Sequence, residues 1–351
     1  MSLIFDKIAE SFSAELPFTS FRKPNGGSIK GFFCNTSEVN YAQNFNEEGF
    51  VFSPFDNLEA SIIFHEKSAQ ILEDVFNEEV LEETKNELKT VYSNREEHLQ
   101  LVSKGINRIT EGDIKKVVLS RKEDVQVSNF DLVTTFKRLL ATYHNAFIYV
   151  WYHPKVGLWM GATPERLVTL EGNEFTTMAL ASTQSYNGDL NPQWGSKEKK
   201  EHQYVVDYIV SQIKDQSNGI ILDEFEVSET YTTKAGNLLH LKANIKGSIG
   251  DFELKKLLKT LHPTPAVCGL PKEKSKEFIL KNEEYNRSFY TGFLGEINVN
   301  QKTELFVNLR CVEFNNNTAS IYVGGGVTID SDPEKEWMET VSKTKTIKSI
   351  L

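Results

Sequence analysis

The alternation of hydrophobic and polar residues along the chain predicts mostly strands, interrupted by amphipathic helices. As far as about residue 90 the pattern is irregular, with short strands expected at 31–35, 49–55 and 60–66 and an acidic helix expected over 72–91. A second helix is expected over 94–109. Strands follow at 115–127, 146–152, 157–163, 166–170 and 174–180, and their turn-sized gaps are typical of an antiparallel meander.

The second half of the chain also mixes strands with helices. Helices are expected over 198–214, 251–261 and 272–282, and strands near 220–228, 237–248, 292–299, 304–314 and 319–328. Two clusters of antiparallel strands, each broken by helices, predict an α+β fold with large sheets and helices packed on one side. Because no repeat or Pro/Ser-rich linker divides the sequence, residues 1–351 are expected to form a single compact unit.

Composition is typical of a soluble globular protein, with 39% hydrophobic and 25% charged residues. No stretch of about 18 apolar residues is present to span a membrane, and the N-terminus does not read as a secretory signal. Cys34, Cys268 and Cys311 are odd in number and lack CxxC spacing, so neither a disulfide framework nor a zinc site is expected and a cytoplasmic location fits best. The net charge of -10 argues against a general nucleic-acid-binding protein.

A pair of glutamates begins the helix expected over 198–214. Glu198 and Glu201 fall on the same arc of the helical wheel as Val205, Ile209 and Ile213, so both carboxylates are predicted to face inward. An inward carboxylate is costly unless a cation or metal neutralises it. The alternative is a charged helix face exposed to solvent.

The segment "DPEKEWMETVSK" (332–343) repeats this spacing near the end of the chain. Asp332 and Pro333 are suited to begin a helix, and Glu336, Glu339 and Lys343 then share one face. Two such helices could bring four carboxylates together, and hard oxygen ligands suit Mg²⁺. A solvated charged stripe would show the same pattern.

Two further ionisable residues lie in predicted strands. Lys116 opens "KVVLSR"; it either reaches solvent from the strand end or is partly buried and serves as a general base. Glu165 in "GLWMGATPERLV" is expected either to pair with Arg166 or to stay protonated in an apolar setting. Together with a metal, these residues would supply a base, an acid and an electrophile for replacing a leaving group on a small acid.

Ten motifs in order give the sequence a family resemblance: "KVVLSR" (116–121), "GATPERLV" (161–168), "ALAST" (179–183), "KEKKEH" (197–202), "HLKANIKG" (240–247), "HPTPAVCGLP" (262–271), "FYTGFLGE" (289–296), "NLRC" (308–311), "GGGV" (324–327) and "DPEKEWMETVSK". The series resembles the chorismate-utilising enzymes, which include isochorismate, anthranilate, aminodeoxychorismate and salicylate synthases. It covers the chain from about residue 95 onward, which separates a catalytic part, 96–351, from a variable part, 1–95. The resemblance implies large antiparallel sheets packed face to face with helices outside, and a Mg²⁺-dependent attack on chorismate.

The resemblance also implies roles for individual residues. Lys116 matches the lysine that activates water for attack at ring carbon 2, and Glu165 matches the acid that protonates the hydroxyl departing from carbon 4. The implied metal site consists of Glu201 and Glu339 as Mg²⁺ ligands, with Glu198 and Glu336 behind them. The implied cradle for the pyruvyl carboxylate consists of Tyr290, Arg310, Gly324, Gly325, Gly326 and Lys343. Arginine can hold a carboxylate with two hydrogen bonds, and glycine allows close backbone approach.

The branch of the family is indicated by "HPTPAVCGLP". Ala266 and Val267 in this motif are similar to isochorismate synthases, whereas the other branches look different here. His240 fits the same branch and shares a strand face with Lys242 and Asn244; a strand histidine satisfied by its neighbours is the alternative. The resemblance therefore implies an isomerase whose product feeds menaquinone or siderophore synthesis. A lyase of the salicylate, anthranilate or aminodeoxychorismate type and a non-catalytic, metal-gated binding protein are the alternatives.

The sequence departs from the family pattern in two places. Ser182 stands where the family usually has Gly, which puts the backbone contact to the ring carboxylate in question, whereas the neighbouring Thr183 is retained. The first 95 residues do not match the tryptophan-binding element of anthranilate synthases, so inhibition by tryptophan is not expected. Neither a glutaminase subunit nor a nucleic-acid or membrane partner is expected, and a monomer is predicted.

Overall fold

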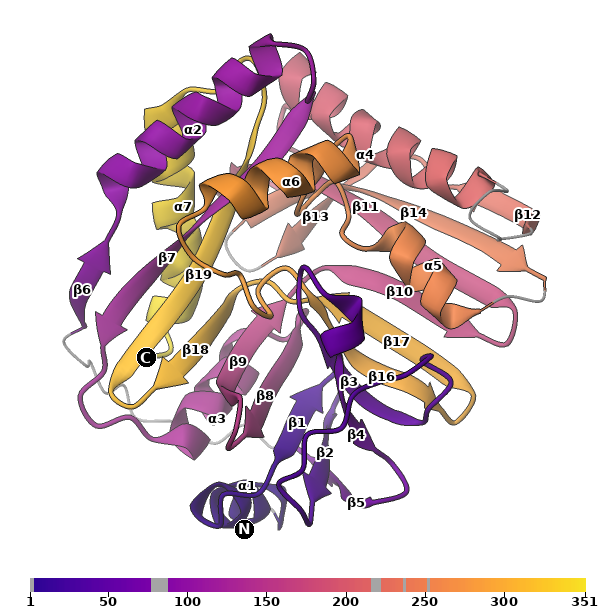
Figure 1. Cartoon of the computed structure of the whole chain (residues 1–351), viewed down its shortest axis with the longest axis vertical. Helices are drawn as coiled ribbons and strands as arrows, with labels where there is room; N and C mark the ends of the chain where they lie inside the picture. Colours follow the sequence, from indigo (N-terminus) through magenta and orange to yellow (C-terminus); the bar gives the residue numbers. More distant parts are fainter. Residues whose placement is uncertain (1–2, 77–87, 216–221, 236–237, 251–252) are drawn as a thin grey trace.

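Two large antiparallel sheets face each other in the computed structural model, which describes residues 3–76, 88–215, 222–235, 238–250 and 253–351 (Figure 1). The first sheet has the order β15 (Gly269–Leu270), β7 (Lys116–Gln126), β19 (Thr318–Val327), β18 (Cys311–Asn315), β9 (Gly157–Thr163), β8 (Phe147–His153), β1 (Phe18–Arg22), β2 (Ser28–Cys34) and β5 (Ala69–Val75), and β6 (Lys89–Ser93) also pairs with β7. The second has the order β12 (Leu222–Val227), β14 (Leu238–Ile249), β11 (Glu174–Ser185), β10 (Arg166–Glu171), β17 (Lys302–Val307), β16 (Phe293–Val299), β3 (Gly49–Ser53) and β4 (Ile62–His65), and β13 (Tyr231–Ala235) pairs with β14.

Helices cover the outer faces of both sheets (Figure 1). They are α1 (Leu3–Ser13), α2 (Arg95–Thr110), α3 (Leu132–Thr142), α4 (Ser196–Lys214), α5 (Leu254–Leu261), α6 (Lys272–Asn282) and α7 (Pro333–Lys348). The helices α4 and α5 pack on the second sheet, and α1, α3 and α7 pack on the first. No helix within the described ranges is long and apolar enough to cross a membrane.

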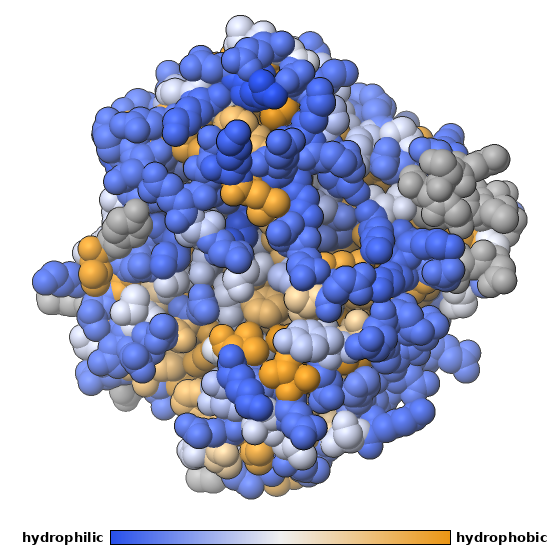
Figure 2. All heavy atoms as spheres, viewed as in Figure 1, coloured by the Kyte–Doolittle hydropathy of each residue, from blue (hydrophilic) through white to orange (hydrophobic). Residues whose placement is uncertain are grey.

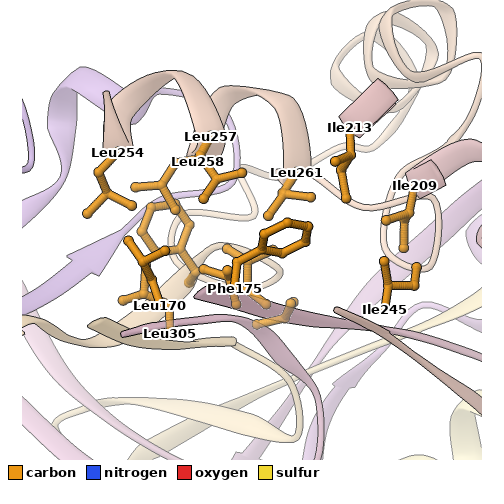
Figure 3. Close-up of a cluster of buried hydrophobic side chains, with 14 of the residues drawn as sticks. Leu170, Phe175, Ile209, Ile213, Ile245, Leu254, Leu257, Leu258, Leu261 and Leu305 are labelled. Carbon is orange, nitrogen blue, oxygen red and sulfur yellow. The ribbon is translucent and has the colours of Figure 1, made fainter. Parts of the chain in front are cut away.

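The hydrophobic core has an outer aliphatic part and an inner aromatic part. Leucines and isoleucines of α4 and α5 pack onto the second sheet around Phe175, for example Ile209 and Leu257 (Figure 3). Between the sheets, aromatic rings stack, with centroid distances of 4.2 Å for Phe52 and Phe289 and 5.3 Å for Phe64 and Trp151. The face of the molecule shown in Figure 2 is mostly hydrophilic, with small hydrophobic patches near its centre.

Two of the crossings of the chain between the sheets, from β9 to β10 and from β17 to β18, lie next to each other. Hydrogen bonds tie these two crossings together: the Thr163 hydroxyl donates to the Val307 carbonyl at 2.5 Å, and the Val307 amide donates to the Glu165 carbonyl at 2.9 Å. The Ala162 amide donates to the Arg310 carbonyl at 3.1 Å. These hydrogen bonds therefore hold the segment that carries Glu165 against the segment that carries Arg310, where the two sheets meet.

The α+β class and the helices expected at 94–109, 198–214 and 272–282 are confirmed. The continuous meander was wrong, because β9 and β10 belong to different sheets, and so was a single strand over 304–314, which the second crossing divides. Alternation is the same on either side of a crossing, so it does not reveal a change of sheet.

The acidic helix expected over 72–91 was also wrong at both described ends. Its beginning lies in the edge strand β5 and its end in β6, while residues 77–87 lie outside the described part of the chain. The many glutamates and lysines favour a helix locally, but pairing with β2 and β7 outweighs this weak preference. The helices α1 and α3 and the strands β1 and β13 were not predicted.

Candidate active site

A cavity of about 170 Å³ lies between the sheets and collects nearly all the predicted site residues. It is lined by Lys116, Glu165, Ser182, Thr183, Glu198, Glu201, His240, Ala266, Val267, Tyr290, Arg310, Gly324, Gly326, Glu336, Glu339 and Lys343. Gly325 is not part of the lining, but a Cβ placed on it would lie 3.1 Å from Glu336 Oε2. The structure thus brings the predicted residues together from both sheets and from α4 and α7.

Lys116 enters the cavity from the first residue of β7 and is only 2% exposed. Its Nζ lies 2.9 Å from Glu201 Oε1, and the Ser182 hydroxyl donates to Glu201 Oε2 at 3.2 Å. Burial opposes ionisation of Glu201, but the Lys116 charge and these hydrogen bonds outweigh it and lower the pKa of its carboxyl. The strand lysine is therefore held inside the protein, next to a carboxylate from α4.

The helix α4 directs Glu201 inward as its sequence pattern predicts. Val205, Ile209 and Ile213 on the same arc are buried against the second sheet, so this face of the helix turns toward the protein. Glu198 lies one turn earlier and is only partly buried. The solvated-face alternative does not describe this helix.

Glu165 lies on the first crossing between the sheets and is 4% exposed. Burial raises the pKa of its carboxyl to about 7, although a hydrogen bond from the Thr264 hydroxyl at 3.4 Å and the charges of Lys116 and Arg310 act in the opposite direction. The alternative pairing with Arg166 is wrong, because that guanidinium forms an ion pair with Glu304 at 3.0 Å. A carboxyl with this pKa can carry a proton near neutral pH.

Ser182 adopts the left-handed backbone conformation that usually favours glycine, with a φ of 62°. The position coincides with an irregularity in the pairing of β11 and β14, between Ala181 and Gln184. Its hydroxyl donates to the Glu198 carbonyl at 2.8 Å, in addition to its bond to Glu201. The serine thus occupies a glycine-type conformation and links β11 to the helix that carries both glutamates.

His240 reaches the cavity from β14 as a neutral ring. Its Nδ1 lies 3.0 Å from the Ser182 carbonyl, which can only accept, so this nitrogen carries the proton. Burial, with the charges of Arg310 and Lys343, lowers the pKa of the imidazole to about 3. Its Nε2 is buried and has no hydrogen-bond partner among the described residues. A hydroxyl group of a bound molecule could donate to this nitrogen.

Cations from the second crossing and from α7 form another wall. Arg310 has a φ of 49°, and its Nη1 is buried without a hydrogen-bond partner in the described part of the chain. Lys343 Nζ donates to the Gly324 carbonyl at 2.8 Å and lies 2.6 Å from Glu339 Oε1. Tyr290 borders the same wall. A guanidinium donor that is still available suits an incoming carboxylate.

The four glutamates offer hard oxygen donors of the type that Mg²⁺ prefers. A Cβ placed on Gly326 would lie 3.0 Å from Glu201 Oε1, and one on Gly325 would lie 3.1 Å from Glu336 Oε2, so these carboxylates closely approach the backbone of β19. Glu336 also accepts a hydrogen bond from the Ser331 hydroxyl at 2.7 Å. Over the described ranges, no three His, Cys, Asp or Glu side chains are gathered as a ready metal site. The residue types fit a divalent cation, whereas two of the carboxylates are directed at lysines.

Thr264 was not singled out from the sequence, although it lies within "HPTPAVCGLP". Thr264 does not line the cavity, but its hydroxyl donates a hydrogen bond to Glu165. The only local signal was a hydroxyl group in an otherwise apolar turn. Its partner is far away in the sequence, so spacing alone could not identify the contact.

The fold and the cavity define a two-sheet α+β protein whose interior site combines a buried acid, a lysine, cations for carboxylate groups and four glutamates. The chain belongs to the chorismate binding enzyme family, whose model matches residues 49–351. This match begins earlier in the chain than residue 95, where the resemblance of the sequence to the family was expected to begin.

Three similar proteins illustrate the relationship. The chain is 30% identical to the vibriobactin-specific isochorismate synthase of Vibrio cholerae over 264 residues and 30% identical to isochorismate synthase DhbC of Bacillus subtilis over 271 residues. Each match covers 72% of this chain, and the matches cover 66% and 67% of those proteins, so the chain spans about two thirds of their length. A crystal structure of a candidate 2,3-dihydroxybenzoate-specific isochorismate synthase, DhbC, from Bacillus anthracis aligns with a TM-score of 0.80 at 26% identity and covers 99% of both chains.

Proposed function

We propose that the chain is an isochorismate synthase, which converts chorismate to isochorismate. The observation that carries this proposal is the meeting of Lys116, Glu165 and Arg310 in one cavity, together with the "HPTPAV" turn. The similar proteins of Vibrio cholerae and Bacillus subtilis carry the same activity in their names. We further propose that the enzyme acts as a monomer in the cytoplasm, without a glutaminase subunit, and that its product feeds menaquinone or siderophore synthesis.

The proposed reaction exchanges one hydroxyl group for another on the ring. Lys116 removes a proton from water as the oxygen bonds to ring carbon 2, both conjugated double bonds of the ring shift, and the bond from carbon 4 to its hydroxyl breaks. Glu165 gives its proton to that hydroxyl, which leaves as water. Burial raises the pKa of the Glu165 carboxyl to about 7, so about half of this acid is protonated at neutral pH. Solvent then restores the protonation states of both residues.

Substrate binding is assigned to the cationic wall and the glutamates. Arg310 supplies an available donor for the pyruvyl carboxylate, with Tyr290, Lys343 and the Gly324–Gly326 backbone beside it. Glu201 and Glu339, with Glu198 and Glu336 behind them, would hold Mg²⁺. When bound, this ion would neutralise the acidic groups and attract the ring carboxylate. His240 and Thr183 border the ring, and Ser182 secures the backbone at that point.

The test is to incubate the purified chain with chorismate and Mg²⁺ in oxygen-18-labelled water and to separate the products by chromatography with mass detection. The proposal expects isochorismate that carries one labelled oxygen and no accompanying pyruvate. Salicylate with pyruvate would identify a lyase of the salicylate synthase type. Unlabelled isochorismate would contradict the attack by water, and unchanged chorismate would contradict the activity itself.

A further inference from the structure

Arg287 lies directly behind the cavity wall without lining the cavity. It is 3% exposed, and its guanidinium forms a two-pronged ion pair with Glu283, with Nε 2.7 Å from Oε2 and Nη2 2.6 Å from Oε1. Burial opposes its charge, but the Glu283 carboxylate outweighs burial and raises the pKa of the guanidinium above its ordinary value. The side chain is therefore a permanent, buried cation.

The remaining guanidinium hydrogens bind three segments of the wall. Nη2 donates to the Val118 carbonyl at 2.7 Å, and Nη1 donates to the Val267 carbonyl at 2.9 Å and to the Thr291 hydroxyl at 3.3 Å. Val118, Val267 and Thr291 all line the cavity. All five donors of Arg287 are thereby used, in the planar arrangement that only a guanidinium provides.

Two of these acceptors connect to the two sides of the proposed chemistry. Val118 lies on β7, two residues after Lys116 and on the same face of the strand. Val267 closes a turn in which its amide donates to the Thr264 carbonyl at 3.1 Å, and the Thr264 hydroxyl contacts Glu165. The Arg287 guanidinium thus joins β7, which carries Lys116, to the 264–267 turn, which contacts Glu165.

We propose that Arg287 is a positioning residue that fixes the spacing between Lys116 and Glu165 by holding β7 and the 264–267 turn at a fixed distance from each other. The proposal rests on the proposed function, because that function assigns the base and the acid. A displacement of about 1 Å in such a pair is enough to cost on the order of 100-fold in rate. Lysine, with its single point of charge, cannot bind both carbonyls and Glu283 in the same geometry.

The test compares Arg287→Lys with Arg121→Lys. Arg121 is equally buried and pairs with Glu123 at 3.1 Å and with Thr340 at 2.8 Å, and none of these residues lines the cavity. For Arg287→Lys we expect kcat to fall by about 10- to 100-fold. KM should change less than kcat, because Arg310 and Lys343 of the carboxylate cradle make no hydrogen bond to Arg287, although Tyr290 of the same cradle lies against its guanidinium. For Arg121→Lys, kcat should change by less than about threefold.

A second variant keeps the proposal testable if Arg287→Lys does not fold. Arg287→Met combined with Glu283→Leu replaces both partners of the pair with apolar groups, a change that proteins often tolerate. The same loss of kcat is expected. Wild-type kcat in either folded variant, an equal loss in Arg121→Lys, or an effect confined to KM would overturn the proposal. Failure of both variants to fold would show that the pair serves stability alone and would overturn it as well.

Hydrogen exchange separates this inference from the proposed function, because it requires no substrate. In a folded Arg287 variant, amides of residues 262–270 should exchange at least about tenfold faster than in the wild type, whereas those of β16 should be unchanged. If the wild-type chain leaves chorismate unchanged, the proposed function is contradicted. Hydrogen exchange alone would then test the positioning role of Arg287. Unchanged exchange at 262–270 would overturn it.

Discussion

Lys116 and Glu201 form an ion pair inside the cavity, with 2.9 Å between Nζ and Oε1. A lysine that takes a proton from water must first be neutral, so the charge on the Lys116 side of this pair has to be lost before the proposed proton transfer. Glu201 is also one of the glutamates assigned to Mg²⁺. The same carboxylate therefore contacts Lys116 in this structure and, under the proposed function, would bind Mg²⁺ in the loaded site.

Loss of the acid or the base should abolish most of the turnover. Lys116→Ala and Glu165→Gln are each expected to lower kcat by about 100- to 10,000-fold, because each removes one proton-transfer group. Steady-state kinetics with chorismate measures the effect. Glu296→Gln is the control, since this carboxylate is also buried but pairs with Lys23 and Lys30 outside the cavity. Near-normal turnover in Lys116→Ala or Glu165→Gln would refute the assigned role.

The alkaline side of the pH profile should report Glu165. In the proposed reaction its carboxyl acts in the protonated form, and burial raises its pKa to about 7, so kcat/KM should fall as the pH rises through about 7. Rates measured from about pH 5.5 to about pH 9 test this expectation. In Glu165→Gln the fall should be absent from the residual activity. A profile that stays level to the alkaline end would exclude Glu165 as the proton donor.

Thr264 should influence where that fall occurs. Its hydroxyl donates to Glu165 and stabilises the carboxylate, so Thr264→Val should raise the pKa of Glu165 and move the fall to higher pH by about half to one pH unit. Thr264→Ser keeps the hydroxyl and should retain the wild-type profile. The comparison of the two pH profiles is the measurement. Identical profiles would show that the contact does not affect the acid.

Removal of divalent cations should stop the reaction, and Mg²⁺ should restore it. Glu201→Gln and Glu339→Gln are expected to raise the Mg²⁺ concentration required for half-maximal activity by at least about tenfold, because each removes a charged oxygen donor. Glu334→Gln is the matched control on α7, since Glu334 is 58% exposed and bonds Arg95. Titration of chelated enzyme provides the measurement. Full activity after complete chelation would eliminate the metal from the mechanism.

Periodicity alone predicted the class of fold and one inward-facing acidic pair, at Glu198 and Glu201. Those carboxylates share a helical arc with isoleucines and valine, which is a local property of the sequence. The rest of the site came from the resemblance of ten motifs to a family. Lys116 and Glu165 are unremarkable in their own segments, and only the pairing of distant segments makes them neighbours of one cavity.

The contacts that the sequence did not predict are long-range and depend on tertiary structure. Arg287 resembles a surface arginine in a polar segment, and its burial follows only from the packing of β7, the 264–267 turn and α6. The change of sheet at Glu165 could not be predicted either, because the strands before and after it show the same alternation of hydrophobic and polar residues. Helix propensity also gave a wrong prediction for β5, where pairing with β2 prevails over the helix preference of an acidic segment.

The paired crossings have a consequence for motion within the site. Glu165 and Arg310 lie on different crossings, yet the hydrogen bonds through Val307 and Ala162 join those crossings into one unit. If the sheets slide or spread, Glu165 and Arg310 should therefore move together, whereas Lys116 on β7 and His240 on β14 belong to different sheets. A change in the separation of the sheets would therefore leave the spacing between Glu165 and Arg310, the proposed proton donor and the proposed carboxylate anchor, unchanged.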